Sequence, residues 1–178
     1  MTRLATVIFL VFSASSAEAQ PVPESQWTPR ARLGLAASCV SEAGFDSHRT
    51  RECSALAHLY ARRWHRLRAR GSRVSFDGLI RQYSSPLRTG RRGWVLALRA
   101  NDRRPRGMPS HLWELVRDDW VGTLAMVDRW YAGEEFDPCP GSEHFGSRED
   151  GAPRHWIRIG CDVAVRNRFY RVGRRPRR

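Results

Sequence analysis

The feature that most constrains this fold is a set of four segments in which apolar residues recur at helical spacing. The segments span residues 33–40, 53–67, 76–83 and 113–131. Apolar side chains at positions i, i+3, i+4 and i+7 lie on one side of an α-helix and pack against a shared core. The pattern therefore predicts a mainly α single domain of four to five helices.

Residues that commonly begin or end helices flank these segments. Pro29 suits the first turn of the first helix, and Ser75 and Ser110 are candidate N-caps for the third and fourth. Gly71 and Gly133 follow the second and fourth segments, where glycine commonly ends a helix. These signals predict where each helix starts or stops.

The remaining sequence is less regular. Residues 136–153 contain prolines, glycines and acidic residues without a helical pattern, so we expect a long connection there. Residues 156–165 alternate apolar and polar side chains, which predicts a short strand or an irregular closing segment. The domain is thus expected to end in an irregular C-terminal segment.

The first 19 residues have the features of a secretory signal peptide. Arg3 precedes an apolar run over residues 4–12, and Ala17-Glu18-Ala19 supplies a small-residue cleavage site. No later apolar run is long enough to cross a bilayer, so no transmembrane segment is expected. The sequence therefore predicts an exported protein, secreted or periplasmic, with one domain over residues 20–172.

The chain is strongly basic. Its formal net charge is +13, all 31 basic residues are arginine, and residues 173–178 form a basic tail. Such a charge attracts polyanions, among them nucleic acid, anionic lipid and bacterial wall polymers. Because export removes the protein from cytoplasmic nucleic acid, anionic wall polymers are the expected partners and no specific nucleic acid is expected.

Cys39, Cys53, Cys139 and Cys161 all lie in the exported part, and an even cysteine count there predicts disulfides. Three connectivities are possible. The local pairs Cys39 with Cys53 and Cys139 with Cys161 are preferred, since each closes a short loop and would stabilise by about 3 kcal/mol. A zinc site is the rival interpretation, but no Cys-x-x-Cys spacing supports it, so no metal is expected.

Glu42 is the candidate catalytic residue, since it ends an apolar helical segment beside small residues. A carboxylic acid at the edge of an apolar segment can remain protonated near neutral pH and act as a general acid. The alternative is that Glu42 lies at a solvated helix end without a catalytic role.

Several separated motifs resemble those of bacterial cell wall hydrolases of the SleB type, in the same order along the chain. They are Ser41-Glu42-Ala43-Gly44, the helix over residues 54–68, Gln82-Tyr83-Ser84, Ala132-Gly133, His144-Phe145, Trp156, Ile159-Gly160 and Asn167-Arg168-Phe169-Tyr170. The resemblance covers residues 33–172 and implies a lysozyme-like domain that cleaves the glycan strand of peptidoglycan with Glu42 and without a cofactor.

The resemblance also suggests residues that bind the sugar. Gln82, Tyr83 and Ser84 would line the groove, and Trp156 and Tyr170 would offer aromatic faces for stacking. The alternative for the aromatic residues is a role in packing, because Tyr83 completes a helical stripe and Trp156 could fill the core.

The chain departs from the family pattern in three places. Phe45 and Asp46 replace the second glutamate of the opening motif, Arg62-Arg63 stands where the family commonly has Asn-Arg, and six residues separate Gly160 from Asn167. These changes mark a divergent member.

Two chemical routes are open for a glutamate of this kind. As a lytic transglycosylase, the enzyme would protonate the glycosidic oxygen with Glu42 and then use the same carboxylate to deprotonate the sugar's own hydroxyl. Hydrolysis by a muramidase would normally need a second carboxylate, for which Asp46, Glu52 and Asp77 are candidates.

Two further functions share part of this evidence. A non-catalytic, cationic wall-binding protein would have the same signal peptide, disulfides and charge. A secreted nucleic-acid-binding protein is the other alternative, suggested by the arginines of the tail close to Phe169 and Tyr170.

Overall fold

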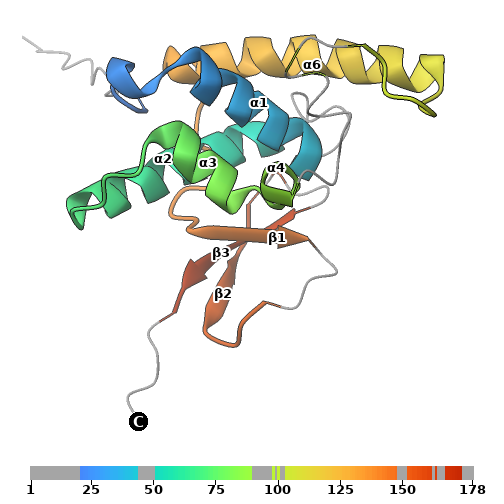
Figure 1. Ribbon diagram of the computed structural model, residues 1–178. Coiled ribbons are helices and arrows are strands. Elements are labelled where there is room, and N and C mark those ends of the chain that lie inside the picture. The colour runs from blue at the N-terminus through green and yellow to red at the C-terminus, as the bar shows by residue number, and fades with distance from the viewer. Residues whose placement is uncertain are drawn as a thin grey trace, which may run out of the picture.

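The computed structural model of the chain describes residues 21–43, 51–89, 98, 100, 103–147, 152–161, 163 and 167–173 (Figure 1). The expected signal peptide, Asp46 and the tail beyond residue 173 lie outside these residues.

The described chain is mainly helical, as the sequence predicts. A short 3-10 helix, Glu24–Gln26, precedes α1 (Pro29–Ala43), α2 (Glu52–Ala69), α3 (Phe76–Tyr83), α4 (Ser85–Thr89) and α6 (Ser110–Tyr131). The strands β1 (His144–Ser147), β2 (Trp156–Ile159) and β3 (Asn167–Val172) follow. Each of the four apolar stripes forms one of the longer helices.

The helix ends agree with the sequence signals at most positions. Pro29 is the first residue of α1, and the Ser75 hydroxyl accepts a hydrogen bond from the Gly78 amide at the start of α3. Gly71 and Gly133 adopt positive φ angles of 83° and 79°, which favour glycine. The prediction for Ser110 is wrong: Ser110 is the first residue of α6, and Pro109 occupies the N-cap position without a side-chain cap.

Helix α1 is the centre of the fold. Ten of its 15 residues are buried, because α6, α2 and α3 all pack against it. A helix with apolar or small residues on most sides requires this kind of enclosure. In Figure 1, α1 lies directly beneath α6, with α2 and α3 below it.

The core around α1 contains large aromatic side chains. Trp130, Tyr60 and Phe76 are the bulkiest fully buried residues near the helices, and Phe169 of β3 is buried as well. Burial of each such side chain contributes about 1.5–3 kcal/mol. These side chains belong to the same buried cluster as the apolar residues of α1.

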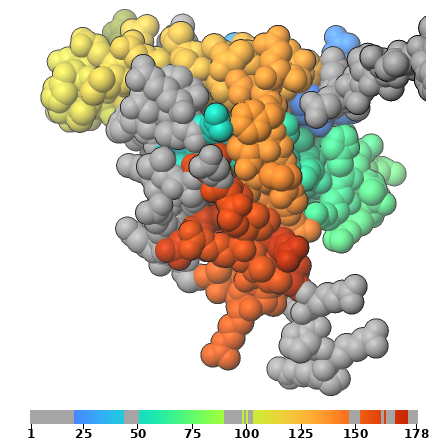
Figure 2. Space-filling view, turned by 180° about the vertical axis from the view of Figure 1, so that it is seen from behind, coloured from blue at the N-terminus to red at the C-terminus, as the bar shows by residue number. Residues whose placement is uncertain are grey.

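The strands form one antiparallel sheet in the order β1-β3-β2. His144 pairs with Tyr170 and Trp156 pairs with Val172. Figure 2 shows this sheet below the helices, reached by the orange segment that follows α6. The long connection expected over residues 136–153 has no helix among its described residues, and it contains β1, whose four residues including a glycine are too few to show strand periodicity in the sequence.

Two disulfides brace the described chain. Cys39–Cys53 joins the last turns of α1 to the start of α2, and Cys139–Cys161 joins the segment after α6 to the end of β2. These are the local pairs favoured by loop length. Disulfides of this kind are typical of proteins outside a reducing cytoplasm.

Within the described residues, no helix has the length and apolar content that a bilayer span requires.

Candidate functional site

Glu42 lies in the last turn of α1 with its side chain partly exposed. The hydroxyl of Ser84 donates a hydrogen bond to Oε1 of Glu42 over 3.1 Å. Ser84 is fully buried at the C-cap of α3, so its own position is fixed by packing. The fold therefore brings together two residues that the sequence separates by 42 positions.

A buried tyrosine lies beneath this pair. The hydroxyl groups of Tyr60 and Ser38 are 2.9 Å apart and share a hydrogen bond. Burial raises the pKa of Tyr60 far above its ordinary value, and the charge of Glu42 raises it further, whereas Ser38 and Arg63 oppose this shift. Tyr60 is therefore a neutral polar group within electrostatic range of both Glu42 and Arg63.

Tyr83 lies beside Ser84 and carries Arg63 on its ring. The guanidinium carbon of Arg63 is 3.4 Å from the centre of the Tyr83 ring, which is cation–π geometry. Arg63 Nη1 also lies 3.4 Å from the carbonyl oxygen of Glu143 and 3.3 Å from Nδ1 of His144. Arg63 thus connects α3 to the first strand of the sheet.

His144 continues this connection across the sheet. Its ring stacks on Trp156 with 4.0 Å between centroids and 19° between planes, and Trp156 lies 5.6 Å from Tyr170. Burial lowers the pKa of His144, and Arg63 lowers it further. A neutral imidazole can accept a hydrogen bond from Arg63 at Nδ1, which agrees with the observed contact.

Most of the expected site residues therefore lie in one continuous row. It runs from Glu42 and Ser84 through Tyr83, Arg63 and His144 to Trp156 and Tyr170. Trp156 is half-buried and Tyr170 is buried, so packing accounts for much of their contact.

Gln82 is the exception. Its side chain is exposed and forms no hydrogen bond with any described residue.

A pocket opens beside this row, with a volume of about 510 Å³. Its lining includes four residues of α2 and four residues from other segments: Arg63, Arg66, Leu67 and Arg70, and Tyr83, Glu143, His144 and Val172. Arg66 Nη2 contacts Glu143 Oε1 at 2.6 Å, and the Val172 amide donates to Oε2 over 2.7 Å. These contacts outweigh the opposing effect of burial and lower the pKa of Glu143.

The pocket arginines were not anticipated as site residues. They occupy positions 63, 66 and 70, and the spacings of three and four residues place them on one helix face. The spacing can be read from the sequence. That it marks a pocket can be seen only in the fold, where Glu143, His144 and Val172 line the same pocket.

The candidates for a second carboxylate are not placed beside Glu42 in an open groove. Glu52 is fully buried at the start of α2. Asp77 is nearly buried, forms an ion pair with Arg81 at 2.5 Å, and lies against Gly34, two turns before Glu42 on α1. Asp46 lies outside the described residues.

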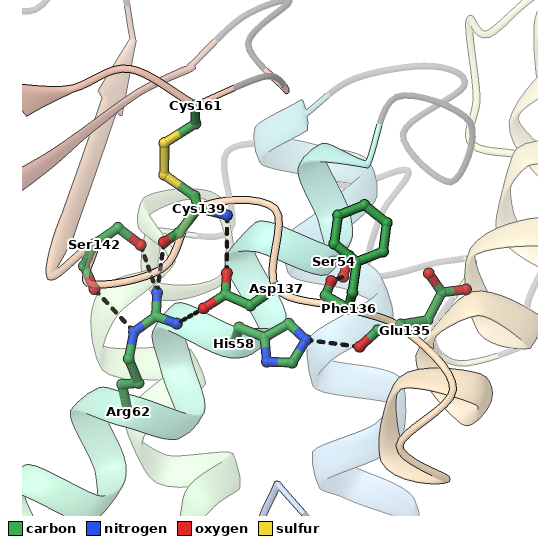
Figure 3. Close-up of polar contacts among 9 residues, drawn as sticks. All are labelled: Ser54, His58, Arg62, Glu135, Phe136, Asp137, Cys139, Ser142 and Cys161. Atoms are coloured by element: carbon green, nitrogen blue, oxygen red, sulfur yellow. Dashed lines mark hydrogen bonds and ion pairs between the residues drawn. A yellow bond between two sulfur atoms is a disulfide. The ribbon is translucent and has the colours of Figure 1, made fainter. Parts of the chain in front are cut away.

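A different side of α2 holds the connection between α6 and the sheet (Figure 3). Arg62 forms an ion pair with Asp137 and donates to the Ser142 hydroxyl at 2.6 Å and to the Cys139 carbonyl at 3.2 Å. Ser54 and His58 precede Arg62 on α2 at intervals of about one helical turn. Ser54 donates to the Phe136 carbonyl, and His58 Nε2 contacts the Glu135 carbonyl. We call this set of contacts the loop clamp.

The loop clamp explains how a connection without helical pattern is positioned. It fixes residues 135–142 against α2, and the Cys139–Cys161 disulfide extends the attachment to β2. The loop clamp and the disulfide therefore fix the position of the segment that leads into the sheet, whose strands carry His144, Trp156 and Tyr170.

Among the described residues, no group of three or more His, Cys, Asp or Glu side chains has an arrangement suited to a metal ion. The disulfides also remove all four cysteines as ligands.

Comparisons with protein-family models, with curated proteins and with solved structures find no match to this chain.

Proposed function

We propose that the protein is an exported enzyme that cleaves the glycan strand of bacterial peptidoglycan with Glu42 as general acid and base. The observation that carries this proposal is the placement of Glu42: a partly exposed carboxyl group at a helix end, hydrogen-bonded by buried Ser84. Glu42 and Ser84 come from two motifs on which the resemblance to SleB-type hydrolases rests.

The surroundings of Glu42 suit this role. Ser84 fixes the rotamer of the carboxyl group, and a general acid must be positioned before its proton can reach the leaving oxygen. The neutral hydroxyl of Tyr60 adds no competing charge.

Among the two chemical routes, the arrangement favours lytic transglycosylation. In that route the Glu42 carboxyl protonates the glycosidic oxygen as the bond to the anomeric carbon breaks. The resulting Glu42 carboxylate then takes the proton from the sugar's own hydroxyl, whose oxygen bonds to the anomeric carbon and closes an anhydro ring. Glu52 is fully buried and Asp77 is paired with Arg81, and this route needs no second carboxylate.

A non-catalytic wall-binding protein is the second candidate, favoured by the net charge of +13 and by the arginine-lined pocket. Such a protein would retain wall polymers through charge alone and would not depend on Glu42.

The test is a Glu42→Gln variant of the mature chain, assayed both for release of soluble fragments from purified peptidoglycan and for co-sedimentation with it. The proposed enzyme loses release while co-sedimentation persists, because glutamine keeps the shape of the side chain but cannot donate the proton. Equal release by both proteins contradicts the role of Glu42. Co-sedimentation without release by the wild type supports the wall-binding candidate.

A further inference from the structure

The pocket beside the candidate site has an excess of positive charge. Arg63, Arg66 and Arg70 line it, and Glu143 is the single carboxylate among the described residues of the lining. Three guanidinium groups therefore face one carboxylate. Since arginine keeps its charge at any physiological pH, an anionic ligand would be attracted into the pocket.

Arg63 provides the strongest argument that the pocket binds an anion. Its side chain is half-buried, and burial lowers its pKa. Cations withdrawn from water are normally paired with a carboxylate. Yet in the described part of the chain Arg63 contacts a carbonyl oxygen, a ring nitrogen and the face of Tyr83, with no carboxylate.

Arg66 shows that the same pocket accommodates a carboxylate. One oxygen of Glu143 contacts the Arg66 guanidinium at 2.6 Å, and the other accepts the Val172 amide at 2.7 Å. Arg70, one helical turn further along, is exposed and has no acidic partner among the described residues. Among the described residues, one of the three guanidinium groups is therefore paired with a carboxylate and the other two are not.

The apolar parts of the lining indicate which chemical groups are attached to the anion. Leu67 and the Tyr83 ring lie in the wall, and Val172 is 45% exposed at the edge. An anion attached to small alkyl groups would use both surfaces, whereas a free phosphate would use only the guanidinium groups. The lining therefore fits the carboxylate of a short peptide.

Two consecutive residues, Tyr83 and Ser84, connect the pocket to the candidate catalytic residue Glu42. Tyr83 lines the pocket, and the next residue, Ser84, donates to Glu42. Consecutive Cα atoms are about 3.8 Å apart, so a ligand held against Tyr83 contacts the residue next to the one that holds Glu42.

We propose that this pocket binds a free carboxylate of the peptide stem that peptidoglycan carries on its glycan strand. The inference rests on the proposed glycan cleavage and names a specificity subsite for it. Strands that retain their stems are then the preferred substrate, and stripped strands are cleaved more slowly.

The first experiment compares cleavage of stem-bearing strands with cleavage of strands from which an amidase has removed the stems. The wild-type mature chain should cleave stem-bearing strands faster, and Arg63→Gln/Arg70→Gln should reduce this preference about tenfold, as expected when charge-assisted hydrogen bonds are lost. Arg73→Gln/Arg104→Gln is the matched control, because both arginines are exposed, neither is among the described residues that line the pocket, and this variant also loses two positive charges. An unchanged preference in the double variant, or an equal loss in the control, overturns the inference.

The second experiment measures binding without turnover. Glu42→Gln protein is titrated calorimetrically with a soluble disaccharide-peptide and with the same compound after its carboxylates are converted to amides. Amidation should weaken binding about tenfold, and equal affinities overturn the inference. Competition by inorganic phosphate that is stronger than competition by acetate also overturns it, in favour of a phosphate-polymer site.

These outcomes separate the two proposals. Cleavage without any preference for stems removes the pocket assignment and leaves glycan cleavage intact. Carboxylate-dependent binding without cleavage by the wild type removes glycan cleavage and leaves the pocket as a peptide-binding site.

Discussion

The two sides of α2 use neighbouring arginines in opposite ways. Arg62 is surrounded by acceptors in the loop clamp, with the Asp137 carboxylate, two carbonyl oxygens and the Ser142 hydroxyl around its guanidinium (Figure 3). Arg63 points about 100° away around the helix, into the pocket, where no carboxylate of the described chain meets it.

The difference teaches how to tell a structural arginine from a binding one in a chain with 31 arginines. Burial is the leading effect on both residues and lowers the pKa of each. What separates them is the supply of acceptors: Arg62 is satisfied within the protein, whereas Arg63 has capacity left for a ligand. Charge alone does not make this distinction.

Stability measurements should give the largest difference between the two sides. Arg62→Gln removes the guanidinium donor from Asp137 Oδ2 and from two carbonyl groups and leaves the Asp137 carboxylate, among the described residues, only the Cys139 amide, so the free energy of unfolding should fall by about 2–3 kcal/mol. Arg63→Gln removes mainly a cation–π contact and should cost less than about 1 kcal/mol. Urea unfolding of the oxidised mature chain measures both. Equal losses of unfolding free energy in the two variants would contradict the distinction between a structural Arg62 and a ligand-binding Arg63.

The rate of glycan cleavage should depend on the hydrogen bond between Ser84 and Glu42. Ser84→Ala removes the donor that positions Glu42, and kcat should fall about tenfold while KM changes little, since one hydrogen bond to a carboxyl group contributes on this scale. Ser85→Ala is the control, because Ser85 is exposed at the start of α4 and its side chain does not contact Glu42. The same kcat in both variants would argue against a positioning role for Ser84.

The pH dependence of stability should show a smaller effect from His144. Burial and Arg63 lower the pKa of His144, Glu143 raises it, and Arg66 and His155 lower it. The folded state therefore binds a proton less readily than the unfolded chain, so stability is retained above the usual imidazole pKa of about 6.5 and decreases as the pH falls below it.

His144→Gln should accordingly flatten the decrease in stability between pH 7 and pH 5. Urea midpoints of the variant and the wild type at the two pH values provide the measurement. The effect is expected to be small because the side chain is only half-buried. Identical slopes for the two proteins would show that His144 does not contribute.

The helices were predictable from sequence and the sheet largely was not. Long apolar stripes such as residues 113–131 show their period over several turns, and the Ser75 cap is a local signal. Strand β1 has four residues, and its pairing with β3 joins segments whose register depends on the tertiary structure. A four-residue segment of sequence does not specify which distant strand it pairs with or in which register.

The same limit applies to the candidate site. Motif order identified Glu42 and Ser84, which the fold places within hydrogen-bond distance. It did not identify the contact between Arg63 and His144, which are 81 positions apart and meet because the loop clamp places β1 against α2. Sequence therefore predicted the catalytic candidate better than the pocket next to it.

The most direct test of the account is mass spectrometry of the products formed when the purified mature chain is incubated with intact peptidoglycan. The account predicts soluble fragments whose glycan ends carry anhydro sugars, absent when Glu42 is replaced by glutamine. A digest in which every glycosidic bond remains intact would contradict it.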